Sequence, residues 1–531
     1  MAIKNYSIIK KVFFLLIILT AIFFRLWKLE SVPPGLYPDE AINGNEALES
    51  LKTNTYKVFY PENNGREGLF IWLLSLSFSL FGISIWSLKI IPAVFGIFTV
   101  LGVYLLCKEL FSSNPSYRVQ ADEIALLSSF FLAASFWHTN FSRIGFRAIL
   151  SPFFLVFSLY FLFNGFRNKE RYLFLIGGFF FGLGFYTYIS FRLSVLLLII
   201  ILLLWGVIYK KDRLIKEYLV FTFYFLISVF LIAFPIGIYF LQNPQDFIGR
   251  ATPISVFTAK NPLKEFLKSF FLHLAMFNLK GDTNWRHNLS GSPQLFLPIG
   301  ILFLIGTFVS IKHLKKSLKE KNYSLAVIHC SLISWFLIML LPGMLTVEGI
   351  PHALRVICVI PPAYILAGFG TWHTYLWFRQ KIKEEKLILI LLLFLLFVFI
   401  FQSYKYFIWW GKNKETKNAF AKNYVKIGDY LNSLENEVSK IVIVNQSGVP
   451  VPWPNGIPMP AQTIMFIENS KYKNIRSVYV LPEEIDKIKI NKKPTIIVPM
   501  APDENLFEKL KVMFPTGEVK NKNGVLIFQI I

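Results

Sequence analysis

Long apolar stretches recur along most of the chain, and short polar segments separate them. A helix needs about 20 apolar residues to cross the hydrocarbon core of a bilayer, and by this measure the sequence predicts about 11 membrane-spanning helices. They lie near 8–27, 86–107, 123–139, 149–166, 173–190, 193–209, 219–240, 294–311, 324–345, 355–375 and 386–404. The apolar run 68–83 is shorter, and polar, turn-rich residues follow it. We interpret it as a helix lying at the membrane interface.

The charges between these spans predict an orientation. With a cytoplasmic N-terminus, every short inner segment is basic, as the positive-inside rule requires. Examples are Lys10 and Lys11 before the first span, Arg167, Lys169 and Arg171, and Lys312, Lys315 and Lys316. No small-residue cleavage site follows the first apolar run, so we expect an uncleaved first helix. Much of the net charge of +23 is then a topology signal, and a nucleic-acid partner is not expected.

This orientation predicts two domains. A membrane domain, 1–404, has three outer loops that we expect to form the active site: 28–85, 241–293 and 346–354. The tail, 405–531, has β-rich apolar runs separated by helical stretches such as 418–435. The runs are 440–446, 477–481, 495–500 and 525–531. These patterns predict a small extracytoplasmic α/β domain.

Composition supports a polytopic membrane protein. The chain is 54% hydrophobic and 16% charged, whereas about a quarter of the residues of a soluble domain are charged. Its three cysteines, Cys107, Cys330 and Cys358, lie inside apolar spans. Neither a disulfide framework nor a cysteine metal site is therefore expected.

Candidate functional side chains gather at the predicted outer boundary. Asp39 and Glu40 stand in "SVPPGLYPDEAINGNEAL", just after the first span. The other candidates are Arg66 and Glu67 in "NNGREGLF", Arg143 and Arg147 in "FSRIGFRAIL", Arg192, Asp282, Arg286 and His287 in "GDTNWRHNLSG", and Glu348, His352 and Arg355 in "VEGIPHALRV". Singly, an arginine at a helix end is usually an interface anchor, and an isolated histidine usually a structural hydrogen-bonding group. The functional interpretation depends on their convergence on one membrane face.

Group transfer from a lipid-linked phosphate suits this set. A polyprenyl phosphate keeps its chain in the bilayer and its head group at the interface. Its anionic leaving group needs fixed cations, and arginine offers a planar, permanently charged fork. The acceptor hydroxyl must lose a proton, which a carboxylate within hydrogen-bond reach can accept.

Four stretches resemble a known family. "PDEA" after the first span, "REGL", "GDTNWRHNLSG" and "GIPHALR" are similar to motifs of the bacterial membrane glycosyltransferases of the family-39/83 type. That group includes protein O-mannosyltransferases and the aminoarabinose transferase of lipid A, and its members share the GT-C fold. The resemblance covers roughly residues 1–400.

The resemblance implies roles for several residues. Asp39 would be the catalytic base and Glu40 its supporting partner. Arg66 and Glu67 would lie near the lipid phosphate, and His352 and Arg355 would contact the donor phosphate. The chain carries "REGL" where the aminoarabinose transferases have a lysine before paired prolines. It shows no counterpart of the β-trefoil domain of eukaryotic mannosyltransferases, so a protein acceptor is not implied.

We therefore expect a plasma (inner) membrane glycosyltransferase that moves a sugar, with inversion, from a polyprenyl-phosphate donor to a lipid, glycan or protein acceptor outside. No cofactor is firmly implied, although Asp39, Glu40 and Glu67 offer oxygen ligands suited to Mg²⁺ or Mn²⁺.

Two alternatives stay open. One is a polyprenyl-diphosphate-dependent polysaccharide ligase or polymerase, and the other is a lipid or sugar transporter. The transporter is disfavoured because the spans lack paired, Gly/Pro-broken helices and carry few ionisable residues at their centres.

Overall fold

The computed structural model describes residues 2–249, 251–451, 456–490 and 494–531. The chain forms two compact units. Unit 1 comprises Met1–Trp27, Pro92–Arg143 and Arg147–Trp410, and unit 2 comprises Lys28–Ile91, Ile144–Phe146 and Gly411–Ile531. Each unit is described in turn.

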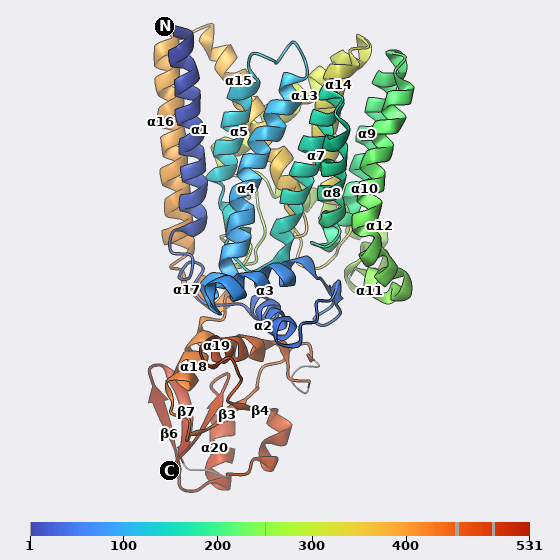
Figure 1. Ribbon diagram of the computed structural model, residues 1–531. Coiled ribbons are helices and arrows are strands. Elements are labelled where there is room, and N and C mark those ends of the chain that lie inside the picture. The colour runs from blue at the N-terminus through green and yellow to red at the C-terminus, as the bar shows by residue number, and fades with distance from the viewer. Residues whose placement is uncertain (1, 250, 452–455, 491–493) are drawn as a thin grey trace. The chain divides into compact units, whose positions relative to one another are not determined.

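Unit 1 is built from long apolar helices that run alongside one another (Figure 1). Within the described residues, seven helices are long and apolar enough to cross a membrane. They are α4 (Ile85–Ser112, which begins in unit 2), α7 with its preceding turn (Arg147–Asn168), α9 with its preceding turn (Ile189–Lys211), α10 (Ile215–Gln242), α13 (Leu297–Lys319), α14 (Tyr323–Met344) and α16 with a following π-helical turn (Glu384–Trp410). These helices indicate a multi-pass membrane protein.

Unit 1 contains further helices. They are α1 (Ala2–Leu26), α5 (Ala121–Ala133), α6 (Phe136–Phe141), α8 (Arg171–Gly184), α11 (Pro244–Ile248), α12 (Pro262–Ala275) and α15 (Ile360–Arg379). Helices α1 and α16 are in contact through Phe23 and Phe399, whose ring centroids are 5.6 Å apart.

Two of the expected spans differ from the observed helices. The stretch 123–139 is divided between α5 and α6, because the Ser135 side chain accepts a hydrogen bond from the His138 amide and starts a new helix. The stretch 173–190 contains only the 14-residue helix α8, followed by a turn and a 3₁₀ helix, Ile189–Leu193. Hydropathy cannot detect a break of this kind, since apolar residues continue on both sides of it.

Glycines allow two helices of unit 1 to approach closely. A Cβ atom on Gly306 of α13 would lie 1.9 Å from the Leu366 carbonyl oxygen of α15. A Cβ atom on Gly370 of α15 would lie 2.0 Å from the Leu302 carbonyl oxygen. Small residues at such crossings let backbones touch, which is how helices commonly pack in membranes.

Unit 2 begins with the segment after α1. It contains α2 (Pro38–Thr53), a two-stranded antiparallel ladder of β1 (Phe59–Tyr60) and β2 (Arg66–Glu67), and α3 (Leu69–Phe81). The helix expected near 68–83 is therefore present. Its 13 residues extend only about 20 Å, which is too short for the hydrocarbon core. Its position at an interface stays a prediction.

The C-terminal part of unit 2 is a five-stranded mixed sheet with the order β4-β3-β5-β7-β6. Strand β3 (Ser439–Ile443) pairs in parallel with β4 (Val478–Val480) and β5 (Thr495–Pro499), and β7 (Val525–Ile530) is antiparallel to β5 and β6 (Gly517–Lys522). The connecting helices are α17 (Lys414–Ala419), α18 (Lys422–Ser433), α19 (Gln462–Tyr472) and α20 (Glu504–Met513).

One face of this sheet packs against α18 and α19, and the other packs against α20. On the first face, Leu431 and Ile464 contact a core that includes Val442. On the second, Phe507 belongs to a core with Ile497. The expected α-helical membrane protein with a small C-terminal α/β domain is confirmed as a fold class. Strand β6 was not expected, because its sequence "GEVKNK" lies at the sheet edge and is mostly polar.

The compact units differ from the expected division at 404/405. Residues Lys28–Ile91 belong with the tail rather than with the membrane helices, and the unit boundary is at Trp410. Polar contacts between α2 and α19 are among those that join this segment to the tail. Asn45 Nδ2 donates to the carbonyl and side-chain oxygens of Gln462 at 3.0 and 2.8 Å, and Asn469 Nδ2 donates to Asn45 Oδ1 at 3.3 Å.

A buried ion pair fastens the β1–β2 ladder to α2. The Arg66 guanidinium donates to the Glu46 carboxylate and, at 3.1 Å, to Asn43 Oδ1. Burial raises the pKa of Glu46 from 4.5 to about 7, although the neighbouring Arg66 opposes the shift. The folded protein therefore holds a proton on Glu46 at pH values where the unfolded chain has lost it.

We expect Asn45→Ala to destabilise unit 2 by about 1–3 kcal/mol, because Gln462 and Asn469 lose a buried partner. Thermal unfolding of the full-length protein in detergent should show a lower midpoint. Asn474→Ala, which removes an exposed asparagine of the same unit, is the control and should leave the midpoint unchanged. Equal midpoints for both variants would contradict the structural role of Asn45.

We also expect stability to decrease as the pH rises from about 4.5 to about 7, because the folded state binds the extra proton in this interval. Glu46→Gln carries no titrating proton and should give a flatter dependence of the thermal midpoint on pH. Parallel pH profiles for the wild type and the variant would disprove this contribution of Glu46.

Candidate functional site

Asp39 lies in the first turn of α2, in unit 2. Tyr37 is the N-cap residue, and Pro38 occupies the first helical position, where its missing N–H costs no hydrogen bond. The Asp39 side chain is half-buried. Asn63 Nδ2 donates to Asp39 Oδ1 at 3.0 Å, and Oδ2 has no hydrogen-bond partner in the described part of the chain. One carboxylate oxygen is thus held while the other is left for a ligand.

Glu40, the neighbouring acid, is fully buried and bonded to backbone. Its carboxylate accepts hydrogen bonds from the Tyr37 N–H at 3.1 Å and from the Gly145 N–H at 2.6 Å. Burial raises the pKa of Glu40, whereas Lys89 and the two backbone donors oppose this shift. The residue closes the first turn of α2 and joins it to the segment Ile144–Phe146. Its geometry suits positioning of Asp39, and a catalytic role stays a prediction.

Gly145 is required for this junction. A Cβ atom there would lie 2.4 Å from Leu88 Cδ2 and 3.2 Å from Glu40 Cβ. Lys89 supports the same region, because its ammonium donates to the carbonyl oxygens of Pro33 and Gly35 at 3.2 and 3.1 Å. The segment that precedes Asp39 is therefore fixed at both ends.

Arg66 and Glu67 are also buried, with 1% and 2% of their surfaces exposed. The Arg66 guanidinium is bonded to Glu46 and Asn43, and Asn43 Nδ2 in turn donates to the Gly145 carbonyl at 2.9 Å. This arrangement gives Arg66 a structural task. The phosphate contact expected for it stays a prediction.

Three further arginines predicted at the site lie in unit 1, where each contacts its own structural neighbours. Arg143 is fully buried and donates to the carbonyl oxygens of Phe24 and Trp27 at 2.8 and 2.7 Å. Arg147 lies 5.3 Å from the centre of the Tyr188 ring. Arg192 lies 4.6 and 4.4 Å from the ring centres of Phe240 and Phe247, and it donates to the Phe247 carbonyl. These contacts agree with the anchoring interpretation of single arginines.

The structure brings together the candidates of the two later loops, all in unit 1. Asp282 Oδ2 accepts hydrogen bonds from His287 Nδ1 and from the Ala353 N–H, both at 2.8 Å. Its Oδ1 accepts from the Asn284 N–H at 2.8 Å. The rings of His287 and His352 are 4.8 Å apart. One buried carboxylate thus joins the loop 280–294 to the loop 346–356.

Arg355 and Glu348 close the second of these loops. Arg355 Nη1 donates to Thr346 Oγ1 at 2.8 Å and to the Glu348 carbonyl at 2.6 Å. The Glu348 side chain itself is exposed. Arg286 lies in the first loop, where its carbonyl accepts a hydrogen bond from Asn140 Nδ2 at 2.7 Å.

Sequence reasoning missed His273 of α12, which supports His352. The His352 N–H donates to His273 Nε2 at 3.1 Å, and His273 Nδ1 lies 2.8 Å from the Ser269 carbonyl. Burial lowers the pKa of His273 to about 4, so the ring is neutral and can accept this hydrogen bond. A single histidine on an amphipathic helix gives no motif by which it could have been found.

Asp282, His287 and His352 also form a group that could hold a metal ion. Their ligand atoms lie within 4.8 Å of one another, and this is the group of that kind found within the described residues. It does not include the carboxylates Asp39, Glu40 and Glu67 that the sequence suggested. Two imidazoles and a carboxylate suit Zn²⁺ better than Mg²⁺.

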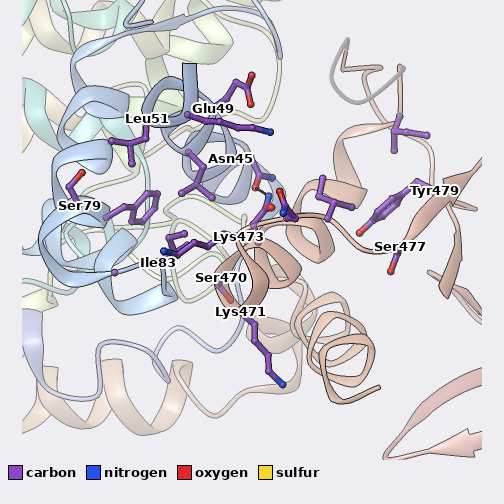
Figure 2. A pocket seen from close by; sticks show the side chains of 18 of the residues that line it. Asn45, Glu49, Leu51, Ser79, Ile83, Ser470, Lys471, Lys473, Ser477 and Tyr479 are labelled. Atoms are coloured by element: carbon purple, nitrogen blue, oxygen red, sulfur yellow. Dashed lines mark hydrogen bonds between the residues drawn. The ribbon is translucent and has the colours of Figure 1, made fainter. Parts of the chain in front are cut away.

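Two pockets of unit 2 contrast in position and charge. A pocket of about 630 Å³ opens beside Asp39 and Asn63. A larger pocket of about 1060 Å³ is lined by α2 and α3 on one side and by the α19–β4 region on the other (Figure 2). Lys52, Lys471, Lys473 and Glu49 make its lining strongly charged. Asp39 does not line the larger pocket, so we place the candidate chemistry at the smaller one.

Comparison with known proteins gives a family for part of the chain. Residues 69–239 match the model of the dolichyl-phosphate-mannose-protein mannosyltransferase family. A protein from Aquifex aeolicus (strain VF5) described only as uncharacterized is 28% identical over 142 residues, which are 26% of this chain and 26% of that protein. The chain thus aligns with about a quarter of the length of this relative.

Solved structures resemble nearly the whole chain. ArnT from Cupriavidus metallidurans bound to undecaprenyl phosphate is 14% identical with a TM-score of 0.55, and the match covers 99% of this chain and 98% of that one. The same protein in the apo state is 12% identical with a TM-score of 0.53, and the match covers 100% of this chain and 98% of that one. The Archaeoglobus fulgidus oligosaccharyltransferase in complex with Zn and sulfate is 14% identical with a TM-score of 0.50. This match covers 92% of this chain and 68% of that one. Residues 69–239 thus match a membrane glycosyltransferase family, and the chain has the GT-C fold that the sequence resemblance implied.

Proposed function

We propose that the protein is a membrane glycosyltransferase that moves a sugar from a polyprenyl-phosphate donor to an acceptor on the outer face of the plasma membrane. The observation that carries this proposal is the state of Asp39. Its carboxylate is fixed through Oδ1 by Asn63, Oδ2 has no hydrogen-bond partner among the described residues, and Asp39 lines a pocket. The family match of residues 69–239 supports the reaction class. The undecaprenyl phosphate bound to ArnT supports the class of donor.

In the proposed reaction Asp39 is the general base. The acceptor hydroxyl oxygen attacks the anomeric carbon of the donor sugar, and its proton passes to Asp39 Oδ2. The bond between that carbon and the phosphate oxygen breaks, and the phosphate leaves with the bonding electrons. Attack opposite the leaving group inverts the anomeric carbon. Proton removal of this kind typically contributes about 10²–10⁴-fold to the rate.

We assign the donor phosphate to the cluster of unit 1 around Arg355, with Arg286, His287 and His352. The Arg355 guanidinium is oriented by two hydrogen bonds through Nη1. Asp282 orients His287 through Nδ1, which leaves the opposite ring nitrogen for a ligand. Fixed cationic donors stabilise the charge that develops on a leaving phosphate, and they need no reorganisation during the reaction.

A divalent cation fits the same cluster. Asp282, His287 and His352 would hold it, and it would supply positive charge to the phosphate oxygens. The proposed base does not depend on this cation, because Asp39 belongs to a different set of contacts.

The proposed orientation follows from the basic inner loops. It puts the N-terminus in the cytoplasm and both the loop 28–85 and the C-terminal domain outside. A polyprenyl carrier is then accessible to the site from the outer leaflet.

Asp39→Asn should abolish sugar transfer, because the amide cannot accept the proton of the acceptor hydroxyl. The measurement is formation of the glycosidic bond in detergent solution, with a radiolabelled polyprenyl-phosphate sugar and a membrane extract as the source of acceptor. We expect a loss of about 10²–10⁴-fold with normal expression and membrane insertion.

Glu49→Gln is the matched control, since Glu49 is an exposed carboxylate on the same helix that lines the other pocket. It should transfer sugar at the wild-type rate. Retained turnover in purified Asp39→Asn would refute the base assignment. Absence of transfer by the wild type with every donor tried would favour a transporter.

Arg355→Ala should weaken binding of the donor far more than binding of the acceptor, because a phosphate loses a charge-assisted partner. We expect the Kd for undecaprenyl phosphate to rise at least about tenfold, which corresponds to about 1.4 kcal/mol. Native mass spectrometry in detergent measures it directly. The control is Arg379→Ala, which removes an exposed ion pair with Glu384. This variant should bind undecaprenyl phosphate with the wild-type Kd. Equal effects on donor and acceptor would count against a phosphate role.

A further inference from the structure

The pocket beside Asp39 is built largely by the C-terminal domain. Asp39, Tyr37 and Asn63 line one part of it. The other lining residues come from α17, the start of α18, the loop 447–449 and the 3₁₀ helix Met459–Ala461, and they include Asn418, Asn423, Tyr424 and Ser447. At about 630 Å³ the pocket has the size of a typical small-molecule site.

Its chemistry differs from that of a phosphate site. Asp39 is the only charged residue in the lining, which consists entirely of described residues, so no cation is present to balance a phosphate or carboxylate group. Three asparagines and a serine offer uncharged side chains that both donate and accept hydrogen bonds. Sugar hydroxyls also do both, and the two tyrosines add rings on which an apolar sugar face can lie.

A peptide fits this lining less well. Extended peptides are commonly bound by adding a strand to the edge of a sheet. None of the residues that line this pocket belongs to a strand. Neutral side chains around a half-buried carboxylate therefore favour a saccharide over a polypeptide.

The wall contributed by the tail is held close to the segment that carries Asp39. Gly35 has a φ of +101°, and a Cβ atom there would lie 2.3 Å from the Phe420 carbonyl oxygen. The Thr463 hydroxyl donates to the Leu36 carbonyl at 3.0 Å. The turn between α17 and α18 thus packs directly on the chain a few residues before Asp39. The wall of the pocket and the Asp39 carboxylate are therefore held next to each other within unit 2.

We propose that this pocket is the acceptor site, and that the acceptor presents an uncharged saccharide whose hydroxyl groups are bound by Asn418, Asn423 and Ser447. This inference rests on the proposed function, because it takes Asp39 as the base. It assigns the choice of acceptor to the C-terminal domain and recognition of the donor to other residues.

The experiment measures binding of simple sugars to the full-length protein in nanodiscs, by saturation-transfer NMR. The probes are methyl α-mannoside and methyl β-glucoside, with methyl β-glucuronide as the anionic probe and a short serine- and threonine-containing peptide as the polypeptide probe. We expect transfer to the neutral glycosides that exceeds transfer to the other two probes.

Asn418→Ala and Asn423→Ala should each weaken binding of the neutral glycosides by about 3- to 10-fold, the loss of one hydrogen bond. Both side chains are exposed, so the variants should fold normally. Asn474→Ala is the matched control, because this asparagine is also exposed but lines the larger pocket. Both pocket variants should still bind undecaprenyl phosphate as the wild type does.

Three outcomes would overturn the inference: no saturation transfer to either neutral glycoside, stronger transfer to the glucuronide or the peptide, or equal losses in Asn423→Ala and Asn474→Ala. Its failure can be told apart from failure of the proposed function. Loss of sugar binding in the pocket variants would support a saccharide site whether or not the protein transfers sugar. Sugar transfer abolished by Asp39→Asn, with no glycoside bound at Asn423, would leave the enzyme proposal standing and remove this one.

Discussion

The candidate active site depends on the hydrogen bonds of buried polar groups, because leaving such a group without a partner costs free energy. Around α2 most of these groups are joined in a connected network, in which Glu40 binds the Gly145 amide and Asn43 binds the Gly145 carbonyl. Arg66 then joins Asn43 to Glu46. The network fixes the first turn of α2 from several directions. Asp39, one residue before Glu40, is thereby oriented mainly through its backbone. Among the described residues its carboxylate is bonded only through Oδ1, to Asn63.

The fold could be predicted from the sequence as far as local pattern decides it. Runs of about 20 apolar residues identify spanning helices, and β-rich runs separated by helical stretches identified the α/β tail. The exceptions have local causes that hydropathy does not record. Ser135 starts a new helix inside an apolar stretch, and β6 is an edge strand with few apolar residues. The association of the segment Lys28–Ile91 with the tail includes a hydrogen bond between Asn45 and Gln462, which are 417 positions apart.

The candidate site divides in the same way. The sequence could identify which residue types gather at one boundary, because acids, arginines and histidines are conspicuous among apolar spans. It could not show which of them are engaged by the fold. Arg66, Arg143 and Arg355 have the same chemistry, and all three have partners in the fold. Arg355 bonds to Thr346 and Glu348 in its own loop, whereas Glu46 and the carbonyl of Phe24 become neighbours of Arg66 and Arg143 only in the folded chain. His273 could not be predicted for the same reason. It contacts the later loop by accepting a hydrogen bond from the His352 amide, and this contact exists only in the folded chain.

The close packing of Gly35 on Phe420 has a consequence for how this protein can change over evolutionary time. The segment at Gly35 and the tail at Phe420 are in contact there with no room for a methyl group. A change in the shape of either surface therefore requires a matching change in the other. A new tail acquired by recombination would have to arrive together with a matching segment before α2. Diversity in the tails of proteins with this fold should therefore be inherited as a two-part module, with covariation between positions nearly 400 residues apart.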